Sequence, residues 1–113
     1  MVNREYDYVE ELELIRLSLD ALVGDRLKNG DYDGAGELVA SAQAGYWGSL
    51  NRAVEDGCLN PDNFKDAKKR ALSGPFGEFR ALISTAQDFD KRLKAGAESA
   101  GIEAQRQNDL YGV

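Results

Sequence analysis

Hydrophobic residues recur every three or four positions along most of the chain, which is the period of an amphipathic α-helix. The strongest stripe lies between residues 8 and 27 and consists of Tyr8, Leu12, Ile15, Leu19 and Leu22. Further apolar residues lie well off that stripe: Val9, Leu14, Leu17, Val23 and Leu27. A helix that is apolar around so much of its circumference needs neighbours on more than one side. We therefore expect residues 6–28 to form the central helix of a small bundle.

Glycine and proline signals divide the rest of the chain into three further amphipathic segments. The predicted helices cover residues 37–56, 61–72 and 75–95, and each is separated from its neighbour by a short connection. Gly30 is expected to end the first helix in the left-handed conformation. Asn60 is expected to cap the third helix, with Pro61 at its first position. Residues 31–36 are expected to form a turn, in which Asp31 or Asp33 caps the second helix.

These segments predict an all-α fold, a compact bundle of four main helices with a candidate short fifth helix at the C-terminus. The chain of 113 residues is the size of one domain. Within it, residues 1–7 and 97–113 are candidates for loose order, and Leu110 and Tyr111 either dock on the bundle or meet a partner. We expect the first and fourth helices to form the main seam of the bundle.

The second predicted helix is rich in small residues at a spacing of four. These are Ala40, Ala44 and Gly48 in one row, and Ser41, Gly45 and Ser49 in another. Such rows let a neighbouring helix approach closely. We therefore expect the leucines of the first helix to pack against them.

The chain is acidic, with a net charge of −6, but its charge is unevenly distributed. Residues 1–56 carry a net charge of −7, whereas residues 57–94 carry +3. The overall sign argues against direct binding to nucleic acid or to anionic membranes. The uneven distribution fits either complementary packing between helices of one chain or a polar contact with another protein, including a second copy.

Residue types that carry common catalytic chemistry are missing. The chain has no histidine and one cysteine, Cys58, which removes the commonest general base and the usual zinc ligands. The acidic turn at residues 31–36 matches only the start of a calcium loop, because Ala42 stands where a glutamate ligand is required. We therefore expect no catalysis, no cofactor and no bound metal. The N-terminal residues lack an apolar signal segment, so a cytoplasmic location is expected.

Two features are candidates for a partner-binding surface. Tyr46 and Trp47 lie between glycines in the second predicted helix, and aromatic residues are enriched among interface hot spots. Tyr46 is also on the apolar stripe, which favours a core position for it. Trp47 fits a core position, an exposed anchor or a stacking platform for a ligand. The second feature is the basic cluster of the third predicted helix, which consists of Lys65, Lys68, Lys69 and Arg70.

The functional hypothesis that follows is a small acidic interaction module that binds another protein and has no enzymatic activity. It would act as an adaptor, an assembly component or a stoichiometric inhibitor, for example a viral or mobile-element inhibitor of a nucleic-acid-processing complex. The alternative is a homo-oligomeric structural protein in which the acidic first half meets the basic third helix of a neighbour. A third hypothesis is an enzyme or metal binder that uses carboxylates.

Overall fold

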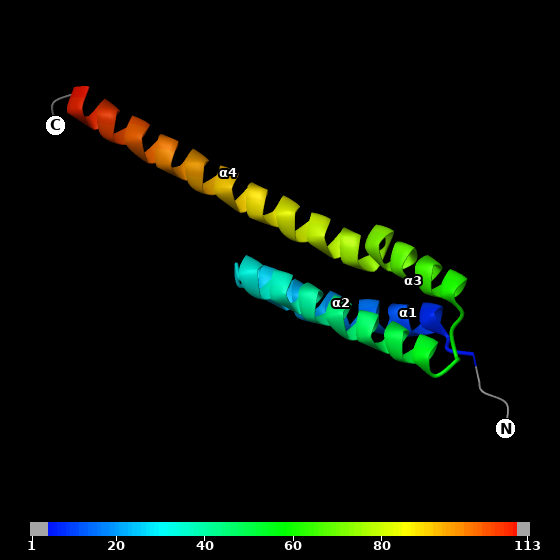
Figure 1. Ribbon diagram of the computed structural model, residues 1–113. Coiled ribbons are helices and arrows are strands. Elements are labelled where there is room, and N and C mark those ends of the chain that lie inside the picture. The colour runs from blue at the N-terminus through cyan, green and yellow to red at the C-terminus, as the bar shows by residue number, and fades with distance from the viewer. Residues whose placement is uncertain (1–4, 111–113) are drawn as a thin grey trace. The chain divides into compact units, whose positions relative to one another are not determined.

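The computed structural model describes the backbone of residues 5–110 and the side chains of residues 5–96. The part that it describes is all-α, as predicted, and contains no strand. The helices are α1 (Tyr8–Lys28), α2 (Tyr32–Glu55), α3 (Pro61–Ser73) and α4 (Pro75–Leu110). Gly74 alone separates α3 from α4, so these two form one long bent helical segment (Figure 1).

The helix ends predicted at Asn60, Pro61 and Gly30 are confirmed. Asn60 accepts a hydrogen bond from the backbone N–H of Asn63 at 2.8 Å, and Pro61 is the first residue of α3. Gly30 ends α1 with a φ of 71°, in the left-handed region that favours glycine. The turn predicted at residues 31–36 is wrong, because Asp31 caps α2 and the helix begins at Tyr32. A strong cap therefore outweighs the low helix propensity of the glycines that follow it.

The chain divides into two compact units, Met1–Ile83 and Ser84–Val113. In the first unit α2 is the central helix, because it packs against α1 and α3 and its Tyr46 and Trp47 also contact Phe76 of α4 (Figure 1). The prediction that α1 is central is wrong, and so is the predicted main seam between the first and fourth helices: α1 packs most extensively against α2. The short connection between α1 and α2 makes them antiparallel neighbours.

The core of the first unit is continuous and apolar. Its largest fully buried side chains are Tyr46, Phe76, Leu50, Val23 and Val39. The ring of Phe76, at the start of α4, lies 6.1 Å from that of Tyr46 and 6.0 Å from that of Trp47. These aromatic contacts join the first turn of α4 to α2.

Most residues of the two rows of small residues on α2 are exposed to solvent. Ala40, Ala44 and Gly48 are exposed, and a Cβ atom placed on Gly45 or Gly48 would meet nothing within 4 Å. The predicted packing of leucines against these rows is therefore wrong. The buried face of α2 carries Val39 and Tyr46, and the small residues lie on the opposite face because of the helical period.

The C-terminal predictions are corrected in part. α4 continues to Leu110 without interruption at Gly96 or Gly101, so there is no separate fifth helix in the part that is described. A single glycine costs a helix only about 1 kcal/mol, which is too little to end it. Residues 1–4 and 111–113 and the side chain of Leu110 are outside the described part. Near the N-terminus, Tyr6 donates its backbone N–H to the carbonyl of Cys58 at 2.9 Å.

Candidate functional site

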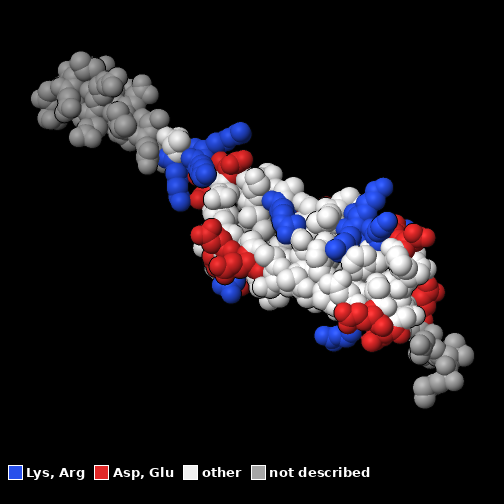
Figure 2. Space-filling view, viewed as in Figure 1, with Lys and Arg blue, Asp and Glu red and all other residues white. Residues whose placement is uncertain are grey.

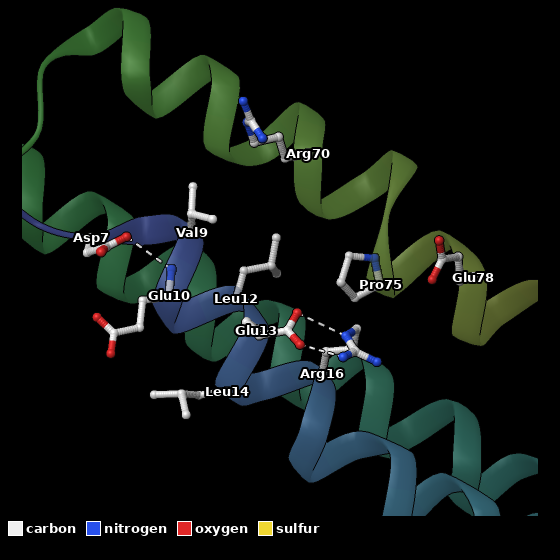
Figure 3. A pocket seen from close by; sticks show the side chains of 10 residues that line it. All are labelled: Asp7, Val9, Glu10, Leu12, Glu13, Leu14, Arg16, Arg70, Pro75 and Glu78. Atoms are coloured by element: carbon white, nitrogen blue, oxygen red, sulfur yellow. Dashed lines mark hydrogen bonds and ion pairs between the residues drawn. The ribbon is translucent and has the colours of Figure 1, made fainter.

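An open groove of about 900 Å³ lies between the N-terminal half of α1 and the junction of α3 with α4 (Figure 3). All of the residues that line it belong to the first unit. They are Asp7, Val9, Glu10, Leu12, Glu13, Leu14, Arg16, Arg70, Pro75 and Glu78. The groove thus combines apolar side chains with four carboxylates and two guanidinium groups.

Most of the apolar side chains that line the groove belong to α1. The side chains of Val9 and Leu12 point toward the opposite wall formed by α3 and α4, where Pro75 lies (Figure 3). Val9 is half exposed, whereas Leu12 is buried at the base. Leu14 and Glu10 point away from that wall and form the outer edge of α1 (Figure 3). An apolar side chain of a ligand could therefore cover Val9, and burial of that surface would be favourable.

The charged part of the groove is centred on Arg16. Its guanidinium pairs with Glu13 and lies 3.3 Å from a carboxylate oxygen of Asp20. These two acids, together with Glu78 of α4, raise the pKa of Arg16, and Glu13 contributes most. The lining of the groove holds four carboxylates and two guanidinium groups, so the groove carries net negative charge. It is suited to receive an additional cation.

A polar network holds the α3 wall next to α1. The hydroxyl of Tyr8 donates to Asp66 at 2.9 Å, and the Nε of Arg70 donates to the same carboxylate oxygen at 2.7 Å. The hydroxyl of Tyr46 donates to the backbone carbonyl of Tyr8 at 2.8 Å. Arg70 and then Tyr8 stabilise the ionised carboxylate, and this lowers the pKa of Asp66. The network therefore links α1, α2 and α3 at one end of the groove.

Replacing Asp66 with asparagine will lower the Tm at neutral pH, and the difference from the parent protein will shrink as the pH falls. The pKa of Asp66 is lower in the folded state than in the unfolded chain. Its stabilising effect is therefore complete above the unfolded value of about 4 and is lost as the pH drops through the lower folded value. Thermal unfolding measured from pH 7 down to pH 3 tests this prediction. An equal Tm difference at both ends would contradict it, and an Arg70→Gln background should reduce the difference.

Tyr46 lies in the core and not on a surface. Its side chain is 1% exposed, and burial raises the pKa of its hydroxyl. The prediction that Tyr46 belongs to a partner-binding surface is therefore wrong, and its place on the apolar stripe of α2 decides its position. The buried hydroxyl is satisfied by the carbonyl of Tyr8, so it needs no external partner.

Trp47 occupies an intermediate position at the edge of the core. Its ring lies 5.8 Å from that of Tyr46 and is partly buried. The ammonium of Lys68 lies 5.5 Å from the centre of the Trp47 ring and 4.7 Å from that of Phe64. Lys68 therefore covers two aromatic rings through cation–π contacts and packs α3 onto α2.

The other basic residues of α3 are divided between two surfaces. Lys65 and Lys69 are exposed, and a group of basic side chains lies over α3 in Figure 2. Arg70 instead lines the groove and pairs with Asp66. The six residues predicted as one partner-binding surface therefore do not form a single surface.

Of the residues that line the groove, only Arg70 is among the site residues that the sequence predicts. The acids near the start of α1 complement the helix dipole, and Asp7 does act as the N-cap of α1, accepting from the N–H of Glu10 at 3.0 Å. That local role explains their abundance without a binding site.

Comparisons of this chain with protein-family models, curated proteins and solved structures found no match. In the described part of the chain, no three side chains of histidine, cysteine, aspartate or glutamate are grouped so that they could hold a metal ion. The described helices also include none that is long and apolar enough to cross a membrane. The groove is therefore the feature on which a functional proposal can be based.

Proposed function

We propose that this chain is a non-catalytic protein-interaction module whose groove binds a cationic amphipathic helix of a partner protein. The observation that carries the proposal is the half-exposed Val9 in a groove whose lining holds four carboxylates and only two guanidinium groups. An apolar anchor beside uncompensated negative charge favours a ligand that has both leucine-like and lysine-like side chains. Such a module acts as an adaptor, an assembly component or a stoichiometric inhibitor.

A helix is the ligand shape that suits the groove. α1 forms one wall, the junction of α3 with α4 forms the other, and α2 packs against both α1 and α3. These elements supply three positions of a helical bundle. A helix bound in the groove would take the fourth position and complete a compact four-helix bundle.

The acidic surface also defines the kind of partner. Complementary charge accelerates association and rejects acidic competitors, so the groove should select basic segments. Basic segments are common in proteins that handle nucleic acid. An inhibitor that occupies the basic surface of a nucleic-acid-processing complex, encoded by a virus or a mobile element, is one specific form of the proposed module.

Binding of a synthetic peptide tests the proposal. The probe is a fluorescent amphipathic helix of about 18 residues, which is near 27 Å long, with leucines on one face and lysines beside them. Fluorescence anisotropy should show saturable binding that weakens with added salt. The variant Val9→Gln should bind about ten times more weakly, because the apolar anchor of the groove is lost.

A matched variant and a matched peptide serve as controls. Leu17→Gln changes an α1 side chain that is exposed to a similar extent but does not line the groove, so binding should be unchanged. The second peptide carries glutamate in place of each lysine and should not bind. Equal binding of the two peptides, or equal loss with Val9→Gln and Leu17→Gln, would disprove the proposal.

A further inference from the structure

The outward face of α3 has the chemistry that the groove requires. Lys65, Lys69 and Leu72 are spaced by four and three residues, so they share one face of the helix. Both lysines are exposed, and Leu72 is 48% exposed. Lys68 is not part of this face, because its ammonium is held over the rings of Trp47 and Phe64. The outward face of α3 thus carries two lysines, with the apolar Leu72 at its C-terminal end.

The groove and this face are neighbours on the same molecule. Arg70 lines the groove, and Lys69 is the adjacent residue of the same helix. Two copies related by a twofold axis could therefore exchange contacts, each placing its α3 in the groove of the other. The outward face and the groove cannot meet within one chain, because α3 itself forms the groove wall.

We infer that a second copy of this chain occupies the groove, with Lys65 and Lys69 near the carboxylates and Leu72 against Val9. The inference rests on the groove described under the proposed function. α3 has 13 residues and is about 20 Å long. One face of so short a helix buries much less than the roughly 800 Å² per partner of a standard interface. Each copy must therefore place its α3 in the groove of the other. Two contacts per dimer double the buried surface. The partner helix must then displace α3, so dimerisation regulates access to the groove.

Charge-reversal variants test this inference on the full chain. The groove-reversed variant is Glu10→Lys with Glu78→Lys, and the face-reversed variant is Lys65→Glu with Lys69→Glu; all four positions are exposed. Sedimentation equilibrium at low and high salt should show a dimer for the parent chain. Each variant alone should be at least about 100-fold weaker in self-association, because like charges then face each other.

A mixture of the two variants provides the decisive measurement. In the mixed dimer each groove meets an α3 face of opposite charge, so an equimolar mixture should regain the dimer that neither variant forms alone. The control Lys28→Glu with Arg52→Glu changes two charges outside the groove and the outward face of α3, and should dimerise like the parent chain. Adding the cationic peptide should convert the parent dimer to a monomer that carries one peptide.

Failure of this inference can be told apart from failure of the proposed function. A parent chain that is monomeric at all concentrations but still binds the cationic peptide would overturn the dimer and leave the proposed function standing. A dimer that survives both charge reversals would place self-association elsewhere and also overturn the inference. A chain that neither dimerises nor binds the peptide would overturn both.

Discussion

Replacing Leu50 with alanine will lower the free energy of unfolding by about 2–5 kcal/mol. Leu50 is fully buried on the face of α2 that packs in the core of the first unit. Truncation removes three heavy atoms from a filled site, so the cost combines lost transfer free energy with the cavity that remains. Urea unfolding followed by the fluorescence of Trp47, the single tryptophan of the chain, measures it directly.

The same substitution at Leu17 is the matched control. Leu17 lies on α1 and is 54% exposed, so its removal opens no cavity. We expect Leu17→Ala to change the free energy of unfolding by no more than about 0.5 kcal/mol. Equal losses at Leu50 and Leu17 would show that the assignment of the core is wrong.

Replacing Gly77 with alanine will destabilise the protein by about 1–3 kcal/mol, which is the usual cost of an overpacked site. A Cβ atom at Gly77 would clash with the backbone carbonyl oxygen of Leu72, on the other side of the bend between α3 and α4. A backbone atom cannot move aside as a flexible side chain can, so the bend itself must shift. Because Pro75 and Glu78 lie at this bend, we also expect weaker binding of the cationic peptide.

The opposite sign is expected for the same substitution at Gly48. This glycine is in the interior of α2 and is exposed, and a Cβ atom added to it would have no neighbour within 4 Å. Alanine there should stabilise the protein by about 0.5–1 kcal/mol, because it reduces the backbone entropy lost on folding. Thermal unfolding of both variants is the measurement. A loss of stability with Gly48→Ala similar to that with Gly77→Ala would contradict the packing described for both positions.

The helix boundaries that could be predicted are those that depend on near neighbours. Asn60 and Pro61 begin α3 as expected, and Gly30 ends α1. Each of these effects involves a side chain or a φ angle and a backbone group within a few residues. The extension of α4 through Gly96 was missed because a propensity of about 1 kcal/mol is a weak guide to where a helix ends.

The arrangement of the helices could not be predicted in the same way. α1 carries apolar residues around much of its circumference, yet Leu14 and Leu17 are exposed and α2 is the central helix. Periodicity shows which residues share a face, but it does not show which face meets a neighbour. The contact of Phe76 with Tyr46 and Trp47 depends on the bend at Gly74, whose direction no pattern in the sequence specifies.

For the candidate site too, the sequence predicts the residue types but not their arrangement in space. The basic cluster of α3 was visible as a run of charges, but its members face different ways, and Arg70 is in the groove while Lys68 covers Trp47. The carboxylates of the groove come from α1 and α4, which are far apart in the chain. Only the packing of α1 and the bent α3–α4 segment beside α2 brings Glu13 and Glu78 to the same groove.

The sequence by itself determined that this protein is all-α, where its caps lie and that its first half is acidic. These properties follow from local hydrogen bonding, helical period and composition, and each can be evaluated from residues close together in the chain. The tertiary structure alone decided that α2 is central and that a groove remains open between α1 and the α3–α4 junction. These properties depend on contacts between distant segments, where several arrangements bury similar apolar area and small differences in packing select one.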